Sequence, residues 1–566
     1  MAVGGNCIVV ATDQPDASFT DSDGDGIDGT ASAAVFVAID GDDANAGTRS
    51  APVRTLARGM SLATSGGRSL LLVGTGTYAE TLLLVPGIGV HGGYIRANGW
   101  ARSASDKTIV RGAGVGLRSL HLTAPTRISF LEVEATNAPV GESSIAGIVS
   151  DSSALVIEDS SFVAGDGGDG AAGTQPATPA KAAAGQAGSP GLLRPLDAAA
   201  PAVCQNAAPQ GGTGGGSGEC RGGTGGSTSA TGFAHVSSGT RAYESTGSPG
   251  ETPTCPGAPV GTGGLGGQFY LSTVSSNFWY VQMAGQVGLD GLPGAPGADG
   301  SAVALGVFSS TGFAAASGLQ GATGQRGGGG GGGGAGSAQG GGFTDLDLYP
   351  IPLPTASHDH CFMSGASGGG GGEGGYGGPG GPGGGGGGAS VALLVLDGSV
   401  TLTRVSLSAG HAGDGGAGAL GALGGDGGDF GGGGSAGSEV SGTRTVSWQG
   451  SNVTVSNPEV RFGSPSGPFY PHSNPPSYIA SGGRGGYGGK GGKGGAGAGG
   501  SGGPSVALVL GSTASLAPSS TAVSYDMTRA AAGTAGTGGG ASNAGAAGLV
   551  AMRASLGADG RIASTQ

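Results

Sequence analysis

Glycine recurs at every third position over long stretches of this chain, and this period constrains the fold more than any other feature of the sequence. In residues 482–496 two glycines alternate with one other residue, and in residues 285–300 one position in three is glycine. The variable positions of the first stretch hold Arg484, Tyr487, Lys490, Lys493 and Ala496. A three-residue period is that of the left-handed polyproline II helix, which makes no internal hydrogen bonds. Rows of glycine leave bare faces on such a helix, where neighbouring backbones can approach closely.

A single helix of this kind has nothing to hold it in place. Ordering each residue costs roughly 1–2 kcal/mol of backbone entropy. A hydrogen bond contributes about 1 kcal/mol, and a Cα–H···O contact about 0.5–1 kcal/mol. We therefore predict that the Gly-rich tracts form a bundle of polyglycine-II-like helices. The alternative is a set of disordered Gly-rich loops hanging from a folded trunk. The Gly-X-Y run is too short for collagen, and the acidic GGDGGD stretch at 424–429 has no tandem copies, as a repeat-in-toxin calcium roll would need.

The composition excludes several other classes of protein. Glycine accounts for 136 of the 566 residues, so an ordinary two-layer core cannot be built from most of the chain. However, 37% of the residues are hydrophobic and only 11% are charged, which is not the composition of a uniformly disordered chain. The net charge of −13 argues against nucleic acid as a partner. No apolar run approaches the roughly 20 residues of a transmembrane helix.

Between the Gly-rich tracts lie short apolar segments with one shared pattern. They begin at Ser144, Ser301, Ser390 and Ser505, and each contains a strand, a small turn, a second strand and then glycine. Their spacing is irregular because Gly-rich excursions of different length follow them. Repeats with insertions at one fixed place indicate a solenoid that carries loops on one face.

The N-terminal third adds a resemblance to a known family. Residues 34–165 carry a strand, a turn, an amphipathic helix and further short strands, with a characteristic set of residues: Gly41, Asp42, Asn45, Gly47, Thr48, Pro52, Thr55, Leu56 and the run Gly76-Thr77-Tyr78. This set resembles the N-terminal region of pectate-lyase-like right-handed parallel β-helix proteins, in particular DUF1565-type surface proteins of myxobacteria and similar bacteria. The resemblance implies a capping helix followed by three-strand coils stacked into a solenoid.

These observations predict an all-β chain: a right-handed parallel β-helix with long Gly-rich insertions that form the helix bundle. The expected division has an acidic segment (1–33), a cap with coils (34–165), and further coils at 301–318, 389–409 and 504–566, the last with a Gly-rich tail. Gly-rich insertions then occupy 166–300, which includes an aromatic segment, 319–388 and 410–503.

The five cysteines suit an oxidising compartment. Four of them are disulfide candidates, and the simplest pairing joins Cys204 to Cys220 and Cys255 to Cys361, although a sequence cannot determine the pairing. That pairing leaves Cys7 alone near the N-terminus, where it is a candidate for lipidation. The residues before Cys7 make a poor lipobox, and too few precede it for a signal peptide.

An acidic stretch, DSDGDGIDG at 21–29, resembles the Asp-Gly calcium loops of thrombospondin type 3 repeats. Its candidate ligands are Asp21, Asp23, Asp25 and Asp28, because alternate carboxylates can converge on a hard cation while glycines allow the turn. An EF-hand would need Glu at the twelfth position, where Ser32 stands. The alternative interpretation is a solvated acidic linker, so calcium is a possible rather than a required cofactor.

No residue carries a pattern typical of catalysis. The coil-like segments contain isolated acids with few basic partners, whereas a polysaccharide lyase or glycosidase needs a calcium-binding carboxylate with a base, or paired carboxylates. Aromatic residues are scarce but clustered, and exposed rings on loops can stack on sugars. The candidates for such stacking are Trp279, Tyr280, Trp448, Phe469 and Tyr470. In the alternative interpretation the clustered rings are structural, and they plug the end of the solenoid or fasten the helix bundle to the coils.

We therefore expect a non-enzymatic protein of the bacterial cell surface or extracellular space, acting as an adhesin, a surface-layer component or a filament. Its expected partners are further copies of itself or a surface polysaccharide. The first alternative is a carbohydrate-active enzyme on the same scaffold. The second is a calcium-dependent binding module.

Overall fold

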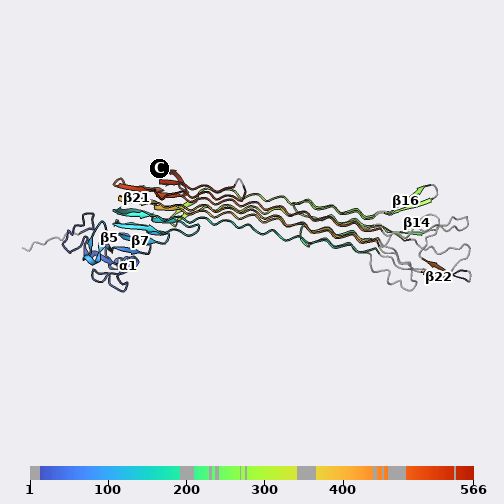
Figure 1. Cartoon of the computed structure of the whole chain (residues 1–566), viewed down its shortest axis with the longest axis horizontal. Helices are drawn as coiled ribbons and strands as arrows, with labels where there is room; N and C mark the ends of the chain where they lie inside the picture. Colours follow the sequence, from blue (N-terminus) through green and yellow to red (C-terminus); the bar gives the residue numbers. More distant parts are fainter. Residues whose placement is uncertain are drawn as a thin grey trace, which may run out of the picture.

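The computed structural model is an elongated molecule with a β-rich end, a long shaft of extended segments and short strands at the far end (Figure 1). We call the β-rich end, which contains residues 13–163, 390–408, 505–526 and 550–566, the base. The described Gly-rich segments between these ranges are called the shaft. The structure describes residues 13–191, 209–228, 233–235, 241–245, 247–267, 269–274, 277–282, 284–340, 365–436, 443–448, 451–456, 480–540 and 543–566.

The base is built on one large, mostly parallel sheet, curled into a half-barrel that is compatible with a β-helix. Its parallel strands lie in three stacks. The first contains β1 (Ala34–Val37), β2 (Leu70–Gly74), β5 (Gly89–Ile95), β9 (Thr126–Ser129), β12 (Ser152–Glu158), the middle of β21 (Ser390–Ser408) and the second half of β24 (Ser505–Leu516). The second contains β3 (Gly76–Tyr78), β7 (Thr108–Gly112), β10 (Leu131–Ala135), β13 (Ser161–Val163), the end of β21 and β25 (Thr521–Asp526). The third contains β4 (Leu82–Leu84), β8 (Val115–Leu120), β11 (Ser144–Ser150), the start of β21, the start of β24 and β26 (Val550–Leu556).

The remaining elements of the base are short. They are the 3₁₀ helices at Ala31–Ala33 and Arg96–Asn98, β6 (Ala101–Arg102), which pairs antiparallel with β5, and β27 (Ile562–Thr565), which pairs antiparallel with β26.

The corners between stacks need backbone conformations that L-residues seldom adopt. Between the first and second stacks, Phe130, Asp159, Arg404 and Ala522 lie above one another, and each has a φ between 47° and 57°. Their alignment follows from the strand register, because residues 129, 158, 403 and 521 occupy matching positions in successive layers. The strain of a left-handed residue is roughly 1 kcal/mol or more at each corner, and parallel pairing on both sides of the corner offsets it.

The N-terminal end of the sheet is closed. Helix α1 (Leu56–Gly66) is capped by Thr55, whose side chain accepts a hydrogen bond from the Arg58 N–H. The helix packs Leu56, Met60 and Ala63 into the main core. The outer edge of β1 is paired as well, because Phe36 N–H donates to Gly47 and Val53 N–H donates to Phe36. The protein thus covers both the core and the backbone edge at this end.

The third stack is apolar on both faces, as continuous runs such as 391–396 indicate. One face lines the main core, and the other forms a second cluster that includes Ile148, Leu394 and Val509. Residues 301–318 help to cover this second cluster, and here the prediction of a coil is wrong. They contain an antiparallel hairpin of β18 (Val307–Ser309) and β19 (Gly312–Ala314), and Phe308 packs into the cluster. The hairpin shares the apolar pattern of a coil because it too must bury one face.

Each Gly-rich connection between the stacks begins after a second-stack strand and ends at a third-stack strand, and the first of them also returns to the base at the β18–β19 hairpin. The excursions run from β13 to β21, from β21 to β24, and from β25 to β26. Three buried serines, Ser144, Ser390 and Ser505, begin the third-stack strands β11, β21 and β24. Ser144 Oγ accepts from Gly165 N–H, and Ser390 Oγ donates to Gly165 O and accepts from Gly410 N–H. Ser505 Oγ in turn donates to Gly410 O. The serines therefore fix the points at which the tracts leave the base.

Short antiparallel strands lie at the far end of the shaft, opposite the base (Figure 1). They form a three-stranded sheet and two hairpins. The strands are β14 (Phe233–His235), β15 (Arg241–Ser245), β20 (Ala338–Gly340), β16 (Phe269–Val274), β17 (Asn277–Gln282), β22 (Thr443–Trp448) and β23 (Ser451–Ser456).

Candidate functional site

Backbone hydrogen bonds in the shaft point in three directions from successive residues. In the 318–336 tract, Gly327 N–H donates to Gly375 O at 2.9 Å and Gly328 N–H donates to Leu292 O at 2.9 Å. Gly332 N–H donates to Glu251 O at 3.0 Å, in yet another tract. The pattern repeats every three residues, as Gly330 and Gly333 again donate to the 365–389 tract. The described tracts are therefore held by one another through their backbones.

The number of neighbours accounts for the number of glycines. Hydrogen bonds connect residues 366–375 to six other tracts: 166–191, 209–216, 220–228, 318–336, 409–436 and 480–504. A Cβ at Gly370, Gly371 or Gly372 would lie 2.1, 2.0 or 2.0 Å from backbone oxygens of three different tracts. No side chain fits at such a distance, so residues 368–372 are glycine in all three rows. Ser367 and Glu373, in the same row as Gly370, keep side chains that accept hydrogen bonds from Ser189 N–H and Ala183 N–H of a neighbouring tract.

The 318–336 tract changes composition where its neighbours change. From Gly318 to Gly327 only one residue in three is glycine, and residues 327–334 are all glycine. The all-glycine part is the part that hydrogen-bonds to the short tracts 220–228, 247–252 and 259–267. On the outer 284–300 tract, by contrast, Leu289 and Leu292 are exposed.

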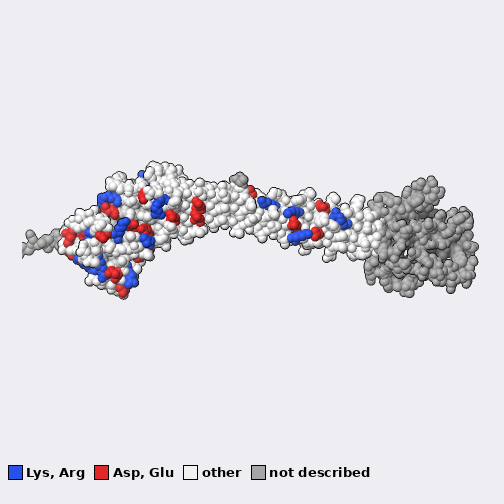
Figure 2. All heavy atoms as spheres, viewed as in Figure 1, with Lys and Arg blue, Asp and Glu red and all other residues white. Residues whose placement is uncertain are grey.

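Side chains of the shaft gather where a tract faces solvent. Figure 2 shows charged residues over the base and over the middle of the shaft, with a largely uncharged stretch between them. On the shaft, Lys490 pairs with Asp426 at 3.2 Å, and the Arg484 guanidinium lies 4.4 Å from the ring centre of Phe430. These contacts are exposed ion pairs and ring contacts of the kind that contribute little to stability.

A disulfide joins Cys220 to Cys255 in the middle of the shaft. The simplest pairing predicted above is therefore wrong, because these two cysteines come from tract ends that are neighbours in the shaft although they are 35 residues apart in sequence. Cys7, Cys204 and Cys361 lie outside the described residues. Sequence spacing could not reveal the pairing, which depends on which tracts lie side by side.

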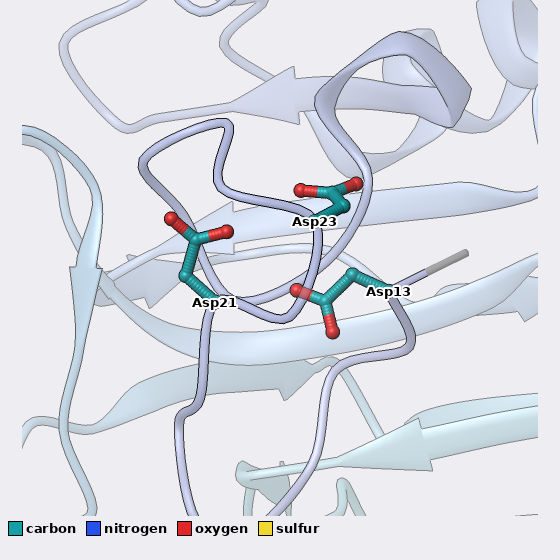
Figure 3. A group of neighbouring side chains, drawn as sticks. All are labelled: Asp13, Asp21 and Asp23. Carbon is teal, nitrogen blue, oxygen red and sulfur yellow. The ribbon is translucent and has the colours of Figure 1, made fainter. Parts of the chain in front are cut away.

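The acidic loop supplies a candidate cation site, shown in Figure 3. Carboxylate oxygens of Asp13, Asp21 and Asp23 lie within 4.8 Å of one another. Hydrogen bonds from the N–H groups of Gly26, Gly24 and Asp25 lower the pKa of Asp21, which keeps this carboxylate ionised. Oxygen ligands of this kind suit calcium, with further oxygens from carbonyls or water.

The other two predicted ligands have different partners. The Asp25 carboxylate accepts hydrogen bonds from Ile27 N–H and Ala31 N–H, which close the loop. Asp28 is buried and forms an ion pair with Arg102 at 2.9 Å. Asp13, which the sequence analysis missed, is a third carboxylate of the cluster. In the sequence Asp13 is an acid eight residues before the motif. That spacing alone does not show that it lies beside Asp21 and Asp23, because the fold brings the three together.

Behind the loop, a buried polar network ties the N-terminal segment to the sheet. Arg102 donates to Asp28 and to Ser129 Oγ, the latter at 2.6 Å. Because Ser129 Oγ accepts from Arg102, its proton is left for His91 Nδ1, 2.8 Å away. Burial holds the pKa of His91 well below its usual value, and the positive charge of Arg102 adds to this effect. Burial also raises the pKa of Asp28, which the ion pair with Arg102 opposes.

This network predicts a stability that depends on pH. Neutral His91 stabilises the fold above about pH 6.5, the pKa of a histidine in the unfolded chain. As the pH falls below that value the unfolded chain gains a proton that the folded chain excludes. The free energy of unfolding should then drop by up to about 1.4 kcal/mol per pH unit between about pH 6.5 and 5. Denaturant unfolding of the wild type and of a His91→Gln variant at several pH values checks this, since the variant should have a clearly smaller slope. Equal slopes would contradict the assignment.

The aromatic candidates are only partly within the described residues. Trp279 and Tyr280 belong to β17, and Trp448 ends β22, so the structure brings both groups to the far end of the shaft (Figure 1). Phe469 and Tyr470 lie outside the described residues.

A groove of about 520 Å³ on the base runs past residues of the second stack. Two of its three acids are in ion pairs: Glu132 with Lys107 at 2.5 Å, and Asp159 with Arg404 at 2.6 Å. The third, Asp106, accepts a hydrogen bond from Ser105 Oγ at 3.3 Å.

Within the residues that the structure describes, no helix has the length and apolar character needed to cross a membrane. Comparison of the chain with protein-family models, with curated proteins and with solved structures finds no match. The likeness to pectate-lyase-like proteins thus remains a prediction from the residues, and the structure bears it out only as far as the curled parallel sheet.

Proposed function

We propose that this protein is a non-enzymatic adhesin of the bacterial cell surface or extracellular space. In this proposal the base is a right-handed β-helix, the shaft is a bundle of polyglycine-II-type helices, and the far end carries the binding surface. The observation that carries the proposal is the network of backbone hydrogen bonds linking the tracts between the base and the strands at the far end.

The shaft is suited to holding a binding surface away from its support. At about 3.1 Å per residue, a tract the length of residues 480–504 extends roughly 75 Å. A bundle of such tracts resists bending because each backbone is hydrogen-bonded on several sides. The disulfide between Cys220 and Cys255 supports an oxidising, extracellular location.

Two other roles on the same scaffold have less support. A head-to-tail filament of β-helices needs two open ends, whereas α1 and the backbone pairing of β1 close the N-terminal end. A polysaccharide-active enzyme needs a free acid or base, whereas two of the three acids in the groove of the base, Glu132 and Asp159, are in ion pairs.

The partner class that fits the far end best is a surface polysaccharide, because β17 and β22 bring tryptophan and tyrosine to the same end of the molecule.

We expect the double variant Trp279→Ala, Tyr280→Ala and the single variant Trp448→Ala to lose at least tenfold in affinity for a bound polysaccharide. Retention on a panel of immobilised acidic and neutral bacterial polysaccharides measures this. Tyr487→Ala, on the exposed side of the shaft, is the matched control and should bind like the wild type. Full binding by the Trp279, Tyr280 and Trp448 variants would contradict the proposal, and cleavage of a polysaccharide would favour the enzyme alternative.

The acidic loop supports a second, smaller proposal, that calcium stabilises the base through Asp13, Asp21 and Asp23. Calcium at a hundred times its dissociation constant should add about 2.7 kcal/mol to the free energy of unfolding. Thermal unfolding with calcium and with a chelator tests this, and Asp23→Asn should remove the difference. Asp426→Asn, which changes the same charge on the shaft, should leave it intact. The same midpoint temperature of unfolding with calcium and with chelator would contradict the proposal of a calcium site.

A further inference from the structure

The number of tracts that lie side by side in the shaft increases at one position along its length. A disulfide lies at the same position. Four short tracts, 209–216, 220–228, 247–252 and 259–267, take part in the shaft only on the side towards the far end (Figure 1). Two turns join them in pairs. The first turn contains Gly216, with a φ of 74°, and the second contains Gly257, with a φ of 75°. The Cys220–Cys255 disulfide connects the two turns.

Two ion pairs reinforce this level. Arg221 and Glu251 pair at 2.5 Å across the same two turns, and Glu251 also accepts from Thr224 N–H. Beside them, Glu373 is buried in the 365–389 tract and pairs with Arg326 at 2.7 Å.

Glu373 connects the turns to the long tracts. Its carboxylate accepts from Ala183 N–H at 3.1 Å and lies against Gly216, where a Cβ would be 2.4 Å from the carboxyl carbon. Gly374 N–H donates to Cys220 O at 2.9 Å. The turns are thus attached to the 365–389 tract and to each other at this level.

The short tracts depend on this attachment more than the long tracts do. Each has only six to nine residues, so few hydrogen bonds oppose the entropy gained when it separates. A long tract such as 480–504 is anchored in the base by Ser505 and bonded along its whole length. Of the two sulfurs, Cys220 is buried while Cys255 is half-buried, so a reductant can reach the bond from the Cys255 side.

We propose that the disulfide is a redox-dependent clamp that holds the four short tracts in register with the long ones. A small dithiol reduces the bond to two thiols and is itself oxidised to a disulfide, in a transfer of two electrons and two protons. The short tracts then separate from the shaft, while the base and the long tracts stay folded. The effect on polysaccharide binding rests on the proposed function, because these tracts lead towards the strands of the far end.

Amide hydrogen exchange on the full chain tests the clamp. We expect the amides of Gly223, Gly225 and Gly250 to exchange at least tenfold faster after treatment with dithiothreitol, and those of Gly488 and Gly491 to change less than twofold. The double variant Cys220→Ser, Cys255→Ser should show the same difference without any reductant, which separates this disulfide from effects at the other cysteines. Cys7→Ser is the matched control and should exchange like the wild type.

Two results would overturn the clamp: unchanged exchange in the short tracts of the double variant, or an equal rise of exchange in short and long tracts. The same samples, applied to the polysaccharide panel, separate this proposal from the proposed function. Faster exchange with no polysaccharide bound by any sample would leave the clamp standing and count against the adhesin.

Discussion

Replacing Gly331 by alanine should destabilise the shaft by about 3–5 kcal/mol, the range of severe overpacking. A Cβ at this position would lie 2.0 Å from Thr262 O and 2.4 Å from the carbon of that carbonyl group, both backbone atoms that cannot move independently. The neighbouring tract would have to shift, and its hydrogen bonds with the 318–336 tract would be lost. Denaturant unfolding, followed by amide exchange of the shaft, measures the effect.

Lys490→Ala is the matched control for Gly331→Ala, because it introduces the same residue into a variable position of the 480–504 tract. The Lys490 side chain is half exposed, and among the described residues it forms an ion pair with the exposed Asp426. We expect a change within about 0.5 kcal/mol, as for other surface substitutions. If the two alanines had equal effects, close backbone packing would not be the reason for glycine in the shaft.

Replacing Arg102 by alanine should destabilise the base by about 3–5 kcal/mol, because it leaves the Asp28 carboxylate buried without its partner. Both side chains of the pair are almost fully buried, with relative exposures of 0% and 1%. The Arg102 guanidinium also lies 4.6 Å from the ring centre of Phe130 and 5.2 Å from that of Tyr94. Denaturant unfolding monitored by the fluorescence of the buried Trp100 would report the loss.

The control for Arg102 is Arg111→Ala, which breaks the pair with Glu134 on the surface of the base. The Arg111 side chain is 47% exposed, so we expect a loss of at most about 1 kcal/mol. The double variant Arg102→Met, Asp28→Leu should recover much of the stability, since it removes both buried charges. A small loss in Arg102→Ala would contradict the view that the network fastens the N-terminal segment to the sheet.

The sequence predicts which residues can lie between close backbones, but not which tracts become neighbours. The triplet period identifies Gly327–Gly334 as residues without side chains to obstruct contact. Their partners depend on where the chain leaves and re-enters the base, which the strand register and the serines at 144, 390 and 505 determine. For the same reason the pairing of Cys220 with Cys255 could not be derived from spacing.

The local pattern of apolar residues also cannot distinguish two structures that each bury one face of a strand. Residues 301–318 alternate apolar and small residues like the other coil-like segments, yet they form a hairpin that covers the outside of the third stack. In the acidic loop, the motif identified Asp21 and Asp23, whereas the roles of Asp13 and Asp28 depend on contacts with Gly29 and Arg102. Such contacts exist only once the sheet has formed.

Amide exchange along residues 482–503 measures whether the Gly-rich backbone is held by its neighbours. We expect glycine amides such as Gly485, Gly488 and Gly491 to exchange roughly a thousandfold slower than in an unstructured peptide, comparable to amides of the parallel sheet. Exchange at the rate of a free peptide in these tracts, with the sheet of the base still protected, would contradict it.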